Sequence, residues 1–211
     1  IIAITGSCGK TTLKELLGNS LTTFLAHDVK DFLSDKKLQN DLNYLKEDGL
    51  VKKIGVSVYS PDEIVNVLNN CNVDVIQLPL NILDHRLIKS GLLKNIKSMG
   101  IEVHARSIFL QGLLFLSKKK LIKMFPDVIQ SINKIKEIAE ANFLKISDLA
   151  LLFVNNNIHV DKLVIGVNNI EQLKSNIGTL KSPYNKDISN QILNYINYTN
   201  ERTLNPALWN Q

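Results

Sequence analysis

The chain has 211 residues, a formal net charge of +5, and 45% hydrophobic against 21% charged residues, the composition of an ordinary globular protein that can bury a substantial core. Two cysteines are too few for a disulfide framework and fit a reducing, cytoplasmic compartment. The modest charge argues against a nucleic-acid partner, and no apolar run approaches the roughly 18 residues of a membrane-spanning helix.

The first predicted element is a strand over residues 1–5, followed by a glycine-rich turn and a helix that begins near residue 13. Such a turn points backbone N–H groups at an anion, while a lysine supplies positive charge and a threonine hydroxyl can hold Mg²⁺. The residues that would bind a phosphate here are Gly6, Gly9, Lys10 and Thr11. The plainer alternative is a chance glycine turn in front of an ordinary helix.

The Gly-x-x-Gly-Lys-Thr spacing, with its flanks, resembles the ATP-binding loop of the Mur ligases, which are amino-acid and peptide ligases of cell-wall synthesis. The resemblance implies ATP with Mg²⁺ as a ligand, covers residues 1–21 and then stops, because no central ligase domain follows. Residues 1–21 are therefore predicted to be a separate phosphate-loop segment, joined to residues 22–211 by fusion or as a chimera. Since the sequence starts at Ile1 and not at Met, the chain is expected to be a fragment, or its start to be an artefact.

From residue 22 onward, short apolar strands alternate with helices. The predicted strands are 22–26, 53–58, 74–79, 101–105 and 162–166. The predicted helices are 35–48, one opened by Ser60-Pro61-Asp62-Glu63, 86–99, a pair within 127–155, 169–180 and a short one in the tail after residue 181. This alternation is typical of parallel βα units, and five units in a row favour a barrel or a doubly wound sheet.

Polar residues follow several of the predicted strands, which in either fold is the ligand-binding edge. The segments around them resemble, in order, the second half of an aldo/keto reductase. The matching segments are 24–28, 50–59, 75–83, 100–114, 164–173 and the tail 204–209. The resemblance spans about residues 20–211. It implies an α/β fold that is an incomplete (β/α)₈ barrel, with parallel strands and outer helices, and NAD(P)H-dependent reduction of an aldehyde or ketone.

The family's catalytic residues are matched only in part. Its members use an Asp, a Tyr and a Lys from the first half of the barrel and a His after the fourth strand, and here only the His is present, as His27. The resemblance therefore implies weak or absent activity. Without the neighbouring segments, His27 would be interpreted as an imidazole packed at a strand end.

The cofactor positions are better represented. By the same resemblance, Ser57 and Gln77 match residues that hold the nicotinamide amide, and Arg106 replaces a stacking Tyr. The remaining matches are Ser107, Leu110 and Gly112 at the pyrophosphate, and Gly166, Gln172 and Asn176 on the adenine side. Many NADPH-specific members carry Lys and Arg where Gly166 and Gln172 stand, so NADP and NAD both remain open. Taken singly, each residue could also be an ordinary loop or cap residue.

Two hypotheses about function remain open at this point. The first is a truncated oxidoreductase that acts on a small-molecule carbonyl; the second is an ATP-binding module built on residues 1–21. An incomplete barrel leaves open strand edges, so self-association is expected. No pair of histidines has metal-ligand spacing, so no metal is predicted. The run Lys118-Lys119-Lys120 is interpreted as a solvated loop.

Overall fold

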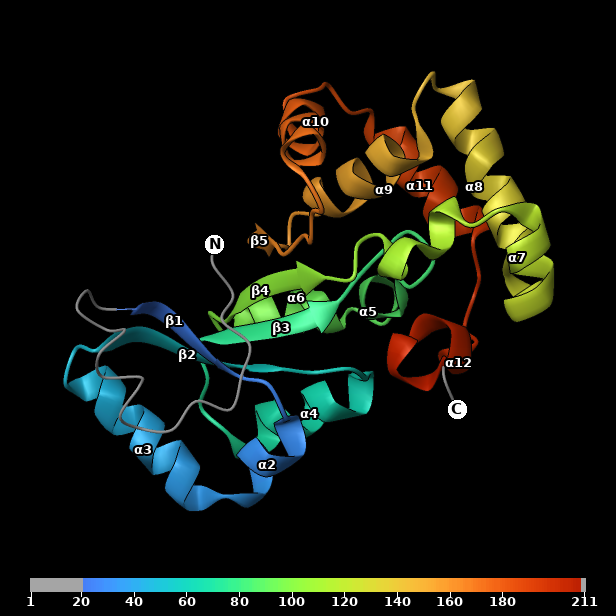
Figure 1. The fold of residues 1–211 in the computed structure, drawn as a ribbon. Coiled ribbons are helices and arrows are strands. Elements are labelled where there is room, and N and C mark those ends of the chain that lie inside the picture. The colour runs from blue at the N-terminus through green and yellow to red at the C-terminus, as the bar shows by residue number, and fades with distance from the viewer. Residues whose placement is uncertain (1–20, 210–211) are drawn as a thin grey trace. The chain divides into compact units, whose positions relative to one another are not determined.

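The computed structural model describes residues 21–209. Its strands are β1 (Leu21–Ala26), β2 (Val51–Ser57), β3 (Val75–Pro79), β4 (Glu102–Arg106) and β5 (Lys162–Leu163). They form one sheet in the order β1-β2-β3-β4-β5 (Figure 1), and the β1–β2 and β2–β3 pairs are parallel. Sheet order therefore equals chain order, as βα alternation predicts. The predicted phosphate loop, Gly6 to Thr11, lies outside the described residues.

The chain divides into two compact units. The described part of the first comprises residues 21–78 and 95–104, and that of the second comprises residues 79–94 and 105–209. Each unit has its own helices. Those of the first include α2 (Val29–Ser34), α3 (Lys36–Glu47) and α4 (Pro61–Asn70).

Helix α4 begins where the sequence predicts, because its first turn satisfies its own backbone donors. The Ser60 hydroxyl accepts a hydrogen bond from the Glu63 amide at 3.2 Å, and the Glu63 carboxylate accepts one from the Ser60 amide at 3.3 Å. This reciprocal capping box, with Pro61 at the first helical position, fixes the start of the helix. Ile64 and Val67 are then buried on one face.

Helix α2 is an element that the sequence analysis missed. The Asp28 carboxylate caps it by accepting hydrogen bonds from the Lys30 and Asp31 amides. Val29 and Phe32, three residues apart on one face, are buried. The sequence signal for this helix was Asp28 followed by two apolar residues three positions apart. A helix of six residues is too short to show a clear helical period of apolar residues.

The second unit is mainly helical. Its helices are η1 (Leu110–Phe115), α7 (Lys118–Met124), η2 (Pro126–Val128), α8 (Ile129–Ala141), α9 (Ile146–Asn155), α10 (Ile170–Leu180), α11 (Lys186–Tyr195), α12 (Glu201–Leu204) and η3 (Pro206–Leu208), together with α5 (Arg86–Lys89). The predicted pair within 127–155 corresponds to α8 and α9. The predicted tail helix corresponds to α11, which buries Ile188 and Ile192 within this unit.

Three predictions in this part of the chain were wrong. The helix predicted over 86–99 is two helices, α5 and α6 (Leu92–Ser98), because Gly91 adopts φ +74° between them. The strand predicted over 162–166 has only two residues. The lysine run 118–120 lies in α7 rather than in a loop, since the Ser117 hydroxyl caps the Lys120 amide, although the three lysines are exposed as expected.

Polar contacts hold the C-terminal segment to η2, which directly precedes α8. The Tyr198 hydroxyl donates to the Asp127 carboxylate at 2.6 Å, and the Asn200 amide donates to the same oxygen at 2.5 Å. Burial, followed by the bond to Asp127, raises the pKa of Tyr198. The phenol therefore stays protonated and acts as the donor.

Tyr198→Phe is expected to lower the free energy of unfolding by about 1 kcal/mol, the usual loss for one hydrogen bond, or somewhat more because the acceptor is charged. Urea denaturation followed by circular dichroism measures this. The matched control is Tyr195→Phe, because Tyr195 lies three residues earlier with 62% of its surface exposed. Equal effects of the two variants would contradict a special role for the Tyr198 hydroxyl.

Candidate functional site

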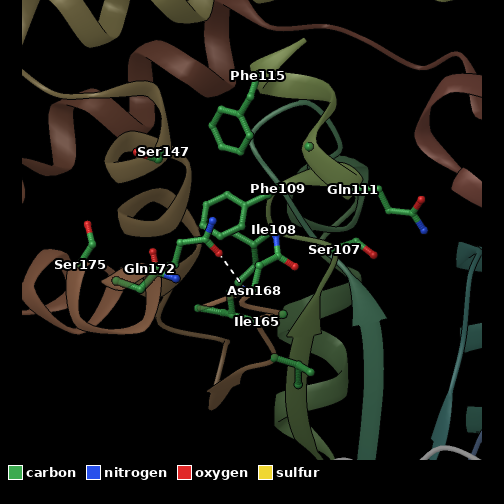
Figure 2. Close-up of a pocket in the computed structure, with 14 residues that line it drawn as sticks. Ser107, Ile108, Phe109, Gln111, Phe115, Ser147, Ile165, Asn168, Gln172 and Ser175 are labelled. Carbon is green, nitrogen blue, oxygen red and sulfur yellow. Dashed lines mark hydrogen bonds between the residues drawn. The ribbon is translucent and has the colours of Figure 1, made fainter. Parts of the chain in front are cut away.

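A cavity of about 560 Å³ lies within the second unit (Figure 2). One wall is the segment 107–115, which follows β4, and the other is the segment 164–176, which runs from the end of β5 into α10. Ser147 of α9 completes the lining. The volume falls within the range of about 300–1,000 Å³ that is usual for small-molecule sites.

The first wall carries an unusual backbone. Ser107, Leu110 and Gln111 have φ values of 59°, 45° and 47°, and Gly112 has 84°. A left-handed conformation costs a residue other than glycine about 1–2 kcal/mol, so this loop is strained at three positions. Leu110 is fully buried and anchors the loop in the core. Strain of this kind is characteristic of ligand-binding segments, where it sets the direction of backbone groups.

In the second wall, two side-chain oxygens accept hydrogen bonds from backbone amides and so fix the start of α10. The Asn169 carboxamide oxygen accepts a hydrogen bond from the Gln172 amide at 2.8 Å, which places Asn169 at the N-cap. The Gln172 side-chain oxygen accepts in turn from the Asn168 amide at 2.9 Å, drawn as a dashed line in Figure 2. Ser175 and Asn176 follow one turn later on the same face, and both line the cavity.

The second unit brings several of the predicted cofactor residues together. Those that line the cavity are Ser107, Gly112, Gly166, Gln172 and Asn176. Leu110 belongs to the same loop, but its side chain is buried in the core rather than lining the cavity. Arg106 immediately precedes the lining, and its guanidinium donates to the Ser107 hydroxyl at 3.2 Å. Contact of these residues with a cofactor stays a prediction.

The other predicted residues lie in the first unit: His27 directly after β1, Ser57 as the last residue of β2, and Gln77 in the middle of β3. Ser57 and Gln77 are direct partners in the parallel register, and the Ser57 hydroxyl donates to the Gln77 carboxamide oxygen at 3.4 Å. Ser57 is buried, with 3% of its surface exposed. His27 follows the last residue of β1 and is exposed, so the alternative of an imidazole packed at a strand end is wrong.

Several cavity residues were not predicted from the sequence. Phe109 and Phe115 lie 5.8 Å apart between ring centroids with their planes tilted by 50°, and Figure 2 shows both at the cavity. Phe115 is half exposed. Ser147 is contributed by α9, far away in sequence, so no local pattern could have assigned it. Ser175, by contrast, directly precedes the predicted Asn176 and could have been inferred with it.

Within residues 21–209, no group of three or more His, Cys, Asp or Glu side chains could hold a metal ion. In that same part of the chain, no helix has the length and apolarity needed to cross a membrane.

The model of the Aldo/keto reductase family matches residues 7–196 and so includes most of the segment that resembles a phosphate loop. The chain is similar to the aldo-keto reductase AKR11C1 from Bacillus halodurans, in its apo and holo forms, with a TM-score of 0.72 and 20% identity. The match covers 92% of this chain and 69% and 68% of those chains.

A second similar structure is the thermostable aldo-keto reductase Tm1743 in complex with the inhibitor epalrestat, with a TM-score of 0.63 and 19% identity. That match covers 87% of this chain and 62% of the other. No curated protein sequence matches the chain. The structural likeness agrees with the predicted barrel-type α/β fold, and the chain spans 62–69% of the length of these structures.

Proposed function

The chain belongs to the aldo/keto reductase family, and we propose that it binds a nicotinamide dinucleotide, with weak or no reduction of small carbonyl compounds. The observation that carries the proposal is the cavity of the second unit. It is lined by five residues that the resemblance assigns to a dinucleotide: Ser107, Gly112, Gly166, Gln172 and Asn176.

The cavity has the properties that a dinucleotide requires. The strained loop after β4 presents neutral backbone groups to the cavity for a pyrophosphate. The start of α10 borders the cavity on the side that the resemblance assigns to adenine. Phe109 and Phe115 supply apolar surface for a ring. At Gly166, no heavy atom lies within 4 Å of the place where a Cβ would stand, so a ligand can approach the backbone closely.

In the first unit, the pair formed by Ser57 and Gln77 offers a hydroxyl and a carboxamide side by side. These two groups can donate to and accept from a carboxamide ligand, as the resemblance assigns them to do. A bound reduced nicotinamide dinucleotide would supply the hydride for the carbonyl carbon. The chain's own contribution is then to hold the ligand and to provide a proton for the carbonyl oxygen.

The proton donor is the weak part of the site. Within residues 21–209, the sequence offers no Tyr, Lys and Asp at the positions that match the family's catalytic group, and only His27 matches. A positioned general acid typically contributes about 10²–10⁴-fold, and loss of orientation reduces the rate further. Low turnover therefore follows from the residues present.

Reductase turnover is expected to lie below detection with a panel of aldehydes, while NADH or NADPH binds measurably. Consumption of the reduced dinucleotide, followed by absorbance, measures the first, and isothermal titration calorimetry measures the second. Robust turnover that persists in His27→Ala would contradict the proposal of low activity. It would also mean that another residue donates the proton.

The binding proposal is tested by Asn176→Leu, which removes a carboxamide from the cavity lining and should weaken dinucleotide binding about tenfold. Its control is Asn190→Leu, the same change at an exposed position of α11 outside the lining. Absence of binding to the unsubstituted chain would overturn the proposed function.

A further inference from the structure

We infer that two copies of this chain associate through helix α10, which packs antiparallel against the α10 of the second copy around a two-fold axis. The inference does not depend on the proposed function, because the side chains that carry it lie outside the cavity lining. It combines an exposed apolar surface with a pattern of charge that fits a copy of itself.

Helix α10 has an apolar stripe on its solvent-exposed side. The stripe consists of Ile170, Leu173 and Ile177, whose exposed fractions are 60%, 44% and 46%. At about 100° per residue, the three side chains fall within about 60° of one another around the helix axis. Single exposed apolar side chains are ordinary on a protein surface, whereas three in line over two helical turns indicate a contact surface.

The stripe is separate from the side of α10 that faces its own unit. Gln172, Ser175 and Asn176 line the cavity, and helical geometry places them about 140° from the stripe. The Thr179 hydroxyl donates to the Asp148 carboxylate of α9 at 2.8 Å, and α10 packs on this helix (Figure 1). Within residues 21–209, the contacts of α10 therefore leave the stripe exposed.

The charges beside the stripe favour a second copy as the occupant. Glu171 and Lys174 are exposed and lie on the same flank of the stripe, about 100° and 40° around the axis from Ile170. Within residues 21–209, neither of the two forms an ion pair. A partner of one sign, such as an anionic membrane or a nucleic acid, would attract one of these charges and repel the other. A copy of the same helix that runs in the opposite direction pairs both.

A two-fold axis at Leu173 aligns the stripes and the charges together. Leu173 then lies on the partner's Leu173, and Ile170 and the partner's Ile177 differ by about 1.5 Å along the axis. Glu171 and the partner's Lys174 also differ by about 1.5 Å, and the symmetry forms this ion pair twice. The antiparallel orientation places the positive end of each helix dipole beside the negative end of the other.

The contact is small and closed. Two helical turns bury less than the roughly 800 Å² per partner of a standard interface, so the dimer should be weak. A two-fold contact stops at two copies. Pairing of the edge strand β1 of one copy with the edge strand β5 of the next would instead be heterologous and open-ended. The size of the assembly therefore distinguishes the two surfaces.

Sedimentation velocity of the full chain between about 5 and 500 µM should show a monomer that converts to a dimer as the concentration rises. Leu173→Glu, which brings two carboxylates together at the two-fold axis, should raise the dissociation constant at least about tenfold. Its control is Ile158→Glu, the same kind of change at a side chain that is 80% exposed and lies outside α10. The control should dimerise like the unsubstituted chain.

An exchange of charges tests the antiparallel register separately. Glu171→Lys or Lys174→Glu alone turns both intermolecular pairs into like charges, and each should weaken the dimer about 3–10-fold at low salt. The double variant Glu171→Lys/Lys174→Glu restores opposite charges and should dimerise within about twofold of the unsubstituted chain. Circular dichroism verifies that each variant is folded.

Four results would overturn the inference. A monomer over the whole concentration range would exclude the dimer, and growth beyond two copies would exclude a closed contact. Dimerisation of Leu173→Glu as strong as that of Ile158→Glu would place the contact on another surface. A double charge variant that stays as weak as the two single variants would exclude the antiparallel pairing of Glu171 with the partner's Lys174.

Discussion

Replacing Gly55 by alanine is expected to lower the free energy of unfolding by about 3 kcal/mol, the upper end of the usual cost of overfilling a packed core. A Cβ at Gly55 would stand 2.4 Å from the Val75 carbonyl oxygen and 2.6 Å from Cδ2 of Leu25. Both neighbours belong to strands that pair with β2. The backbone oxygen cannot move without breaking the sheet, so the strands must separate.

Urea denaturation of Gly55→Ala, followed by circular dichroism, gives the size of this loss. Gly178→Ala serves as the control, because its Cβ would meet open space in the interior of α10. That change should be neutral or stabilising by up to about 1 kcal/mol. An unchanged stability of Gly55→Ala would mean that the β1, β2 and β3 strands can separate around Gly55 at little cost.

His85→Ala is expected to destabilise the second unit by about 2–3 kcal/mol, through the cavity it leaves and the hydrogen bond it removes. His85 is buried, with 3% of the residue exposed, and its Nε2 lies 2.9 Å from the Ile196 carbonyl oxygen. It also meets the Phe153 ring edge to face at 6.0 Å. His159→Ala, in a partly exposed turn, is the control and should have little effect.

The same residue gives stability a pH dependence of predictable sign. Burial, reinforced by the charge of Lys89, lowers the pKa of His85 below its ordinary value of 6.5. The unfolded chain therefore binds a proton more readily than the folded one, and stability falls as the pH drops below about 6.5. The His85→Ala variant lacks this imidazole, so protonation of His85 no longer lowers its stability in acid. The difference in the free energy of unfolding between the unsubstituted chain and the variant should therefore shrink as the pH falls. Parallel curves would contradict the assignment.

The sequence correctly predicted those elements whose position is set by nearby residues or by a regular alternation of strands and helices. The capping box at Ser60 and Glu63 and the chain order of the strands were predicted correctly because capping and βα alternation are local or regular. The helix over 86–99 failed because a single left-handed glycine, Gly91, decides the break. Its sequence neighbours carry an unbroken helical period, which hides it.

Residues of the candidate site could be predicted only where they lie within a continuous segment that matches the family. The loop at Ser107 and Gly112 and the start of α10 at Gln172 were assigned by resemblance, and they line one cavity. Ser147 and Phe115 could not be assigned, because their position depends on how α9 and η1 pack. The left-handed conformations of Leu110 and Gln111 could not be predicted either, because leucine and glutamine rarely adopt a positive φ.

The small number of buried side chains in helix α10 affects how readily the wall of the cavity moves. Of its 11 residues, only Thr179 is buried, so the wall that carries Gln172 and Asn176 packs against α9 with little fully buried apolar surface. An element with so little buried apolar surface is expected to open at a smaller free energy than the rest of the unit. Any ligand held by this wall must also hold the helix closed, and part of the binding energy is spent on that ordering. Binding of a ligand in the cavity is therefore expected to slow amide hydrogen exchange in α10.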